Sequence, residues 1–225
     1  MHDLLDIYKY DIYRGPNIGI YTKTNDSFVF LPNGFAKEKS ETLAKYLKTE
    51  VLITSIANTR LIGIMMALNN NGILLPSTAS DHELQFLKKE TGLNVEILDT
   101  KHNALGNMIA TNDSGAIVSP SIPKESLKKI QDVLGVEVLQ KRVAGYHQVG
   151  AMIVSTSHGG IIHPETDDDD IRIISNVLKT EIEPATINGG IPFVGSGVLA
   201  NNNSVVVGSF TSGPEIMMLT RAFQS

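Results

Sequence analysis

Apolar and polar stretches follow one another in the same order five times along the chain. A unit contains an apolar run after a glycine, a polar turn, a second apolar run that ends at a proline, an amphipathic helix and a third apolar run. In the second unit, residues 61–68 are typical of a strand. Residues 70–72 (Asn-Asn-Gly) are typical of a hairpin turn because Asn and Gly tolerate positive φ, and residues 73–75 form the returning strand. The pattern predicts three strands and one helix per unit, with the third strand of this unit at 95–98.

Two series of marker residues keep the same phase. Prolines recur every 44 residues, at Pro32, Pro76, Pro120 and Pro164, and Gly208 occupies the fifth slot. Glycines recur at intervals of 43 to 45 residues, each followed six residues later by a small polar residue: Gly19 and Asn25, Gly63 and Asn69, Gly106 and Asn112, Gly150 and Thr156, Gly195 and Asn201. A period in this range is typical of repeat architectures. We predict one domain over residues 1–225, with repeats at approximately 17–60, 61–103, 104–147, 148–192 and 193–225.

The fifth unit ends with a predicted helix at 214–223 and has no third strand after it. Residues 4–13 precede Gly19 in the way that third strands precede the other four glycines. We therefore predict that this N-terminal strand pairs with the fifth unit and closes the ring. Closure removes the exposed sheet edges that an open array would have to protect. The expected fold is α/β with five-fold pseudosymmetry.

Three helix starts carry capping signals. Ser80 with Glu83, and Ser212 with Glu215, have the spacing of a capping box, in which both side chains satisfy free backbone amides. Thr166 with Asp169 suggests a third start of the same kind. These signals fix the phase of the helices within the repeat.

Composition narrows the classes of function. Hydrophobic residues make up 42% and charged residues 19%, as in soluble globular proteins, and the net charge of −5 excludes the wrapping of nucleic acid by a basic surface. We expect no DNA partner and only local contact with RNA. The sequence contains no cysteine, which excludes disulfide bonds, metal sites with thiolate ligands and catalysis by a thiol nucleophile.

Targeting signals are not apparent. The run at 61–68 is far shorter than the ~20 residues that span a bilayer. Acidic residues Asp3, Asp6 and Asp11 stand where a signal peptide needs positive charge and an apolar stretch. We expect a cytoplasmic protein without a membrane partner.

Polar residues gather in two sets of loops. One set precedes the repeated glycines and the other forms the hairpin tips, and five-fold repetition places equivalent loops at the same height on a ring. Asn and Asp also favour tight turns for backbone reasons alone.

His158 and His163 lie near Glu165, but their spacing suggests no complete ligand set, so we expect neither a metal nor a cofactor.

Several motifs resemble one known family. They are RLIG at 60–63, NNNGILLP at 69–76, ALGN at 104–107, TND at 111–113, DVLGVEV at 132–138, GGIIHPET at 159–166 and the SG and AN of 196–201. Together they resemble the translation initiation factor 6 family in its archaeal form, in register over nearly the whole chain after about residue 15. The first dozen residues depart from that pattern, and the long tail of eukaryotic members does not follow residue 225.

The resemblance implies a pentein fold, a five-bladed α/β propeller. It also implies a ribosome anti-association factor with a role in ribosome biogenesis and translation initiation, which binds the intersubunit face of the large ribosomal subunit and sterically blocks the small subunit. Family members contact an interface ribosomal protein and approach the sarcin-ricin loop of the rRNA. We expect a monomer that is not an enzyme, with candidate ribosome-facing residues Arg60, Asn69, Asn107, Asn112 and Asp113.

Two other classes remain open. Other penteins are guanidine-modifying hydrolases and amidinotransferases that attack through a cysteine, and this chain offers no obvious nucleophile in its place. The third class is a protein-interaction ring that has no link to ribosomes.

Overall fold

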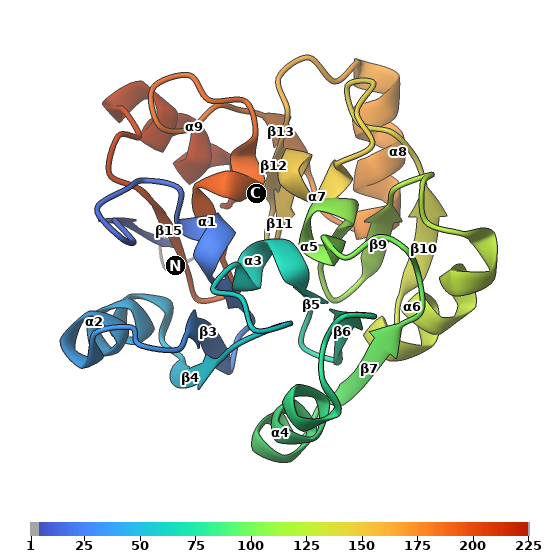
Figure 1. Cartoon of the computed structure of the whole chain (residues 1–225). Coiled ribbons are helices and arrows are strands. Elements are labelled where there is room, and N and C mark those ends of the chain that lie inside the picture. The colour runs from blue at the N-terminus through green and yellow to red at the C-terminus, as the bar shows by residue number, and fades with distance from the viewer. Residues whose placement is uncertain (1–4, 225) are drawn as a thin grey trace.

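The computed structural model describes residues 5–224. Within this range, five three-stranded sheets surround a central axis and a longer helix lies outside each of them (Figure 1). The predicted α/β architecture with five-fold pseudosymmetry is confirmed.

The five sheets share one topology. In each sheet the central strand has two neighbours. It pairs antiparallel with an inner strand on one side and parallel with an outer strand on the other. The inner strands are β2 (Lys23–Thr24), β5 (Ala67–Leu68), β8 (Ile109–Thr111), β11 (Ile153–Ser155) and β14 (Val198–Ala200). The central strands are β3 (Phe28–Pro32), β6 (Gly72–Pro76), β9 (Gly115–Val118), β12 (Gly160–Ile162) and β15 (Ser204–Gly208). The outer strands are β4 (Glu50–Thr54), β7 (Asn94–Leu98), β10 (Glu137–Gln140), β13 (Ile182–Pro184) and β1 (Asp6–Tyr10).

The outer strand of the last sheet comes from the N-terminus. β1 runs parallel to β15, from Asp6 opposite Ser204 to Tyr10 opposite Gly208. The prediction that the N-terminal strand closes the ring is therefore confirmed, although Leu4, where that strand was expected to begin, lies outside the described residues.

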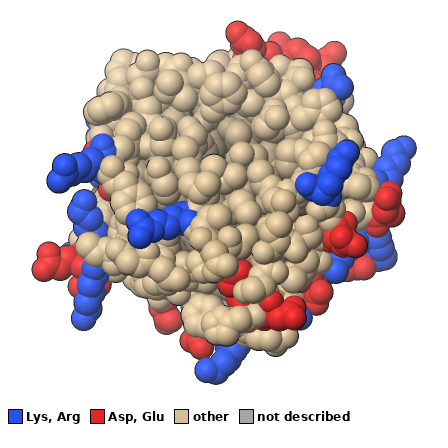
Figure 2. Space-filling view, viewed as in Figure 1, with Lys and Arg blue, Asp and Glu red and all other residues tan. Residues whose placement is uncertain are grey.

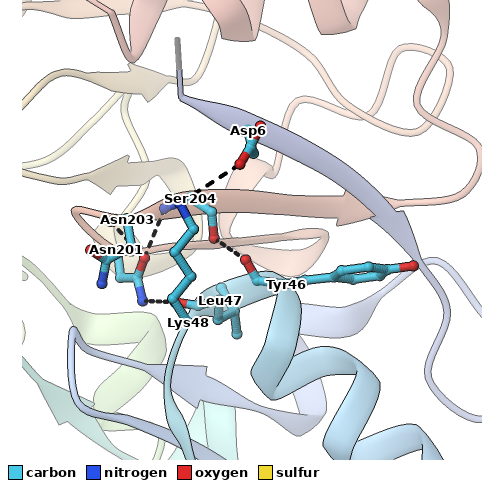
Figure 3. A network of polar contacts seen from close by, with 7 residues as sticks. All are labelled: Asp6, Tyr46, Leu47, Lys48, Asn201, Asn203 and Ser204. Carbon is cyan, nitrogen blue, oxygen red and sulfur yellow. Dashed lines mark hydrogen bonds and ion pairs between the residues drawn. The ribbon is translucent and has the colours of Figure 1, made fainter. Parts of the chain in front are cut away.

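Side chains reinforce this closing seam (Figure 3). The Ser204 hydroxyl donates to the Tyr46 carbonyl at 2.6 Å, and the Asn201 amide donates to the Leu47 carbonyl at 2.9 Å. The ammonium of Lys48 lies 3.7 Å from the Asp6 carboxylate. The first and fifth units are thus joined by sheet, by helix end and by ion pair.

Five longer helices cover the outside of the ring. They are α2 (Lys37–Leu47), α4 (Asp81–Thr91), α6 (Leu127–Leu134, preceded by the 3-10 turn η1, Lys124–Ser126), α8 (Asp168–Leu178) and α9 (Gly213–Ala222). The capping boxes predicted for Ser80 with Glu83 and for Ser212 with Glu215 are both present.

The predicted start of α8 was wrong by one residue. Asp167, not Thr166, is the N-cap, and its carboxylate accepts a hydrogen bond from the Asp170 amide at 2.8 Å. Thr166 instead donates its hydroxyl to the His163 carbonyl, within the turn that leads into the helix. Both residues are good caps, so composition alone did not distinguish them.

The strand predicted over residues 61–68 was wrong in its first half. Ile62–Met65 forms one helical turn, α3, and only Ala67–Leu68 is strand. An apolar run without polar residues carries neither the helical nor the strand period, so the pattern could not separate the two. The equivalent turns are α1 (Ile18–Tyr21), α5 (Leu105–Met108), α7 (Val149–Met152) and the 3-10 turn η2 (Val194–Ser196).

The hairpin after β5 forms without positive φ at Asn70, Asn71 or Gly72. The Asn69 side-chain oxygen instead accepts the amides of Asn71 and Gly72, both at 3.0 Å. The turn predicted here is therefore present, but a side chain rather than a left-handed backbone shapes it.

The inner turns meet around the axis through the five glycines of the repeat, which we call the axis glycines. A Cβ on any one of them would run into backbone of the adjacent unit, in each case the carbonyl oxygen of its axis glycine. The contacts run in one direction around the ring and close on themselves: Gly63 on Gly19, Gly106 on Gly63, Gly150 on Gly106, Gly195 on Gly150 and Gly19 on Gly195. Only glycine permits this approach.

The hydrophobic core lies between the units. It consists of five buried clusters, each of which combines side chains of two neighbouring units. In one of them, Leu199 and Val206 of the fifth unit pack with Leu31 and Leu43 of the first. Every unit therefore depends on both neighbours.

Candidate functional site

The loops before the axis glycines project from one end of the ring. Within the described chain, four of the five contain two consecutive residues with positive φ: Tyr13 and Arg14, Ala57 and Asn58, Ala144 and Gly145, Asn188 and Gly189. An isolated bridge closes each of these turns. Such turns bring the flanking backbone together tightly and leave the side chains at the tip exposed.

Exposed apolar side chains gather in these loops. Five large hydrophobic residues are more than a third exposed: Tyr13, Leu61, Tyr146, Ile191 and Phe193. The rings of Tyr146 and Phe193 pack edge to face with centroids 5.9 Å apart, over the buried His163. We call the surface formed by the inner turns and the loops before them the glycine-end face. Other large hydrophobic residues, such as Phe210 and Met217, are exposed elsewhere on the ring, but a group of apolar side chains on one face is a candidate interaction site.

Charge is nearly absent from the middle of this face. In Figure 1 the inner turns point toward the viewer, and Figure 2 shows the same side with Lys, Arg, Asp and Glu gathered mainly at its periphery. A face with an uncharged centre and a charged rim has the anatomy of a protein–protein interface rather than of a surface that follows phosphates.

Two buried glutamates hold loops of this face in place. Glu215 accepts hydrogen bonds from the amides of Gly189 (3.0 Å) and Gly190 (2.8 Å) and from the hydroxyl of Thr186 (2.9 Å). Glu83 does the same for the second unit, accepting from Ala57 and Asn58. Each carboxylate therefore serves its helix cap and the left-handed turn together.

The same bonds set the acidity of the two groups. Burial by itself would raise the pKa of Glu215, but the hydrogen bonds from Ser212, Gly189 and Gly190 outweigh it and lower the pKa to about 2. The pKa of Glu83 is lowered for the same reason, through Ser80, Asn58, Ser55 and Ala57. Both loops are therefore anchored by groups that stay ionised to low pH.

We expect acid to weaken the fold through Glu215. A pKa of about 2 in the folded chain, against 4.5 in the unfolded chain, stabilises the fold by up to about 3 kcal/mol above pH 5. That contribution is lost as the pH falls from about 5 to 2. In Glu215→Gln, the unfolding free energy, measured by urea denaturation across this range, should lack that part of the slope. The exposed Glu181→Gln is the control and should keep it; an unchanged slope in Glu215→Gln would refute the assignment.

The hairpin tips lie at the other end of the axis and bind one another. Four tip asparagines, Asn25, Asn69, Asn112 and Asn201, are buried, and each donates its amide to the backbone of the next tip. Three of them also donate to the last carbonyls of the next unit's outer helix: Asn69 to Leu134, Asn112 to Leu178 and Asn201 to Leu47. Their side-chain amides are thus used to join units.

Asp113 belongs to a second ring of contacts at the same end. Its carboxylate accepts both the backbone and the side-chain amide of Asn70, at 2.9 and 2.7 Å. Asn70 also donates to Asp26, and Asp26 accepts from Asn202. Three of the five candidate residues, Asn69, Asn112 and Asp113, therefore lie together and are engaged within the ring.

The other two candidates lie at the opposite end. Arg60 is exposed, and its guanidinium lies 6.0 Å from the centre of the Tyr13 ring. Asn107 is partly buried in α5, and no hydrogen bond of its side chain occurs within residues 5–224. The structure therefore divides the five candidates between the two ends and leaves only Arg60 and Asn107 available to a partner at the glycine-end face.

A sequence signal separates the two groups. The position of Asn69 is polar in every unit, whereas the position of Arg60 holds Pro16, Asn103, His147 and Pro192 elsewhere. Residues that recur in all five units serve the ring, while an asymmetric partner needs residues that do not recur. The apolar residues of the loops, such as Tyr146 and Phe193, were missed because the sequence did not show which of them are exposed.

We also searched the described residues for a metal site and for a membrane-spanning helix. Among them there is no group of three His, Cys, Asp or Glu side chains placed to hold a metal ion. No helix in residues 5–224 has the length and apolar character that crossing a membrane requires.

The fold defines the class of protein. The N-terminal domain of ArgZ, an arginine dihydrolase from Cyanobacteria, superposes with a TM-score of 0.54 over 82% of this chain and 74% of that domain, at 13% identity. This likeness concerns the fold alone. The ring of five three-stranded units is a pentein-like α/β propeller.

Sequence similarity then gives the family. A model described as the eIF-6 family matches residues 7–222. The chain is 69% identical over 219 residues to Translation initiation factor 6 of Cenarchaeum symbiosum, which covers 97% of this chain and 99% of that protein. It is 65% identical over 219 residues to the protein of that name from Nitrosopumilus maritimus, with the same coverage. The chain belongs to the eIF-6 family.

Proposed function

We propose that the protein binds the intersubunit face of the large ribosomal subunit and sterically prevents association with the small subunit. The observation that carries this proposal is the match to the eIF-6 family over residues 7–222, together with relatives named Translation initiation factor 6 that align over nearly the whole chain. The proposal includes a role in ribosome biogenesis and translation initiation in the cytoplasm.

Obstruction needs only occupancy by a rigid body. A compact chain of 225 residues has a radius of gyration of about 17 Å, whereas bridges between subunits require contact within a few ångströms. The closed ring supports rigidity, because axis glycines, shared cores and tip asparagines tie every unit to both neighbours. No catalytic step and no cofactor is required.

We assign the contact to the glycine-end face. Arg60 lies there beside the exposed Tyr13, and neither Arg60 nor Asn107 makes a side-chain hydrogen bond within residues 5–224. Arg and Tyr are common centres of binding energy in interfaces. The uncharged centre and a net charge of −5 favour an interface ribosomal protein as the main partner, with only local contact to rRNA near the sarcin-ricin loop. Asn69, Asn112 and Asp113 have a structural role in this proposal.

The enzyme alternative is disfavoured by chemistry. The structural neighbour is an arginine dihydrolase, but the relatives are named translation initiation factors, and this chain has no cysteine to attack a guanidinium carbon. Incubation with arginine and methylated arginines should give no product above the blank. Measurable turnover would restore the enzyme alternative.

Sedimentation tests the ribosomal proposal directly. We expect the monomeric protein to co-sediment one to one with purified archaeal large subunits and to stay at the top of the gradient with small subunits alone. Absence from the large-subunit fraction would overturn the proposal. It would leave the third alternative, a ring that binds some other protein.

A further inference from the structure

A small cavity lies on the axis, between the inner strands. Its volume is about 70 Å³, and Lys23, Thr24, Thr111, Ser155 and the neighbouring apolar residues of β5, β8, β11 and β14 line it. A buried water needs about 10–15 Å³ of such space, so the cavity has room for several waters or for a small ion with water. We call it the central channel.

Lys23 is the only charged residue among those that line the central channel. The equivalent positions in the other units, four residues after each axis glycine, hold Ala67, Ala110, Val154 and Leu199. The lysine is therefore foreign to the repeat. Residues that recur in every unit hold the ring together, as the tip asparagines do. Lys23 does not recur, so we infer that it has a role other than joining the units.

The Lys23 ammonium has no acceptor of its own. Within residues 5–224, no ion pair and no hydrogen bond involves it, and the Thr24 and Thr111 hydroxyls donate to backbone carbonyls. Two acidic groups of the hairpin tips, Asp26 and Asp113, accept hydrogen bonds from asparagine amides instead. Burial lowers the pKa of Lys23 to about 8.

That arrangement leaves a positive charge to be balanced. Lys23 is partly buried, and at neutral pH most molecules still carry the proton, so a charge partly withdrawn from water lacks a partner, which is unfavourable. Within the part of the chain that the structure describes, no carboxylate forms an ion pair with Lys23. A mobile anion that enters the channel would supply it.

We propose that a small inorganic anion, of the size of chloride or phosphate, binds in the central channel beside the ammonium of Lys23. The anion neutralises the charge of Lys23 on β2 and can accept a hydrogen bond from the Ser155 hydroxyl of β11, which is buried and has no partner within the described residues. Binding of an anion to the folded chain alone stabilises that chain by mass action. The inference is independent of ribosome binding, because the channel lies inside the ring.

Thermal unfolding in different potassium salts tests the proposal. At equal ionic strength, the melting temperature of the unmodified protein should be about 3 °C higher in 0.1 M chloride or phosphate than in gluconate, which exceeds the size of the channel. A rise with chloride alone, with phosphate alone or with both supports the site and identifies the anion that occupies it. In Lys23→Met the difference between salts should vanish.

Two controls keep the test decisive. Lys128→Met removes an exposed lysine of α6 and should retain the full salt difference. If Lys23→Met does not fold, NMR of the unmodified protein with ¹³C-labelled lysine replaces it, and the titration midpoint of Lys23 should rise by about one pH unit on exchange of gluconate for chloride or phosphate. The proposal would be overturned if the melting temperature of Lys23→Met still differed between the salts. It would also be overturned if the titration midpoint of Lys23 were the same in gluconate, chloride and phosphate.

Discussion

Gly106→Ala is expected to destabilise the protein by about 3 kcal/mol or more, because the new methyl group has no space. Its position overlaps the carbonyl oxygen of Gly63 and lies 2.8 Å from the carbonyl oxygen of Met66, and both are backbone atoms. A flexible side chain could rotate away, but these carbonyls are fixed by the inner turns. Urea denaturation of the purified variant measures the loss.

The closed ring increases this cost. An open array could relieve the strain by separating two units, whereas here β1 ties the first unit to the fifth. Gly213→Ala is the matched control: nothing lies within 4 Å of its new Cβ, and it should change stability by less than about 0.5 kcal/mol. Equal stability of the two variants would show that the axis glycines do not set the ring geometry.

Substitutions at the two ends of the axis should have opposite effects. Arg60→Glu and Asn107→Lys change groups that are free at the glycine-end face, so each should weaken binding to large subunits by about 10- to 100-fold and leave stability nearly unchanged. Binding is measured by sedimentation at a series of protein concentrations, and stability by urea denaturation.

Asn112→Ala should show the reverse. Its side chain donates to the carbonyls of Thr156 (3.1 Å) and Leu178 (2.8 Å) and accepts the amides of Ser114 and Gly115. Loss of these four buried bonds should cost about 3 kcal/mol, while the folded fraction binds normally at low temperature. Lys89→Glu, on the outside of α4, should alter neither property. Weak binding by a folded Asn112→Ala protein would place the contact at the hairpin tips instead.

The repeat made most of the fold predictable. Periodic prolines and glycines gave the number of units and the order of strands and helix within them, and the missing third strand of the fifth unit pointed to the N-terminal strand, β1, as its replacement. Capping boxes at Ser80 and Ser212 located two helix starts because a cap depends on neighbours in sequence.

Contacts between units were harder to predict. The inner turn at Ile62–Met65 exists where an axis glycine meets the backbone of the next unit, and no local pattern encodes that approach. Likewise, Asn69 and Asn112 looked like loop residues available for binding, since the sequence does not show that their amides reach the helix ends of the next unit. Arg60 and Asn107 stand out only when equivalent positions of the five units are compared.

The measurement that tests steric exclusion most directly is subunit joining followed by light scattering, with large subunits titrated to saturation by the protein. We expect the amplitude of joining to fall in proportion to the occupied fraction and to approach zero at saturation. Joining at the normal rate and amplitude, with the protein still bound to the large subunits of the joined ribosomes, would contradict it.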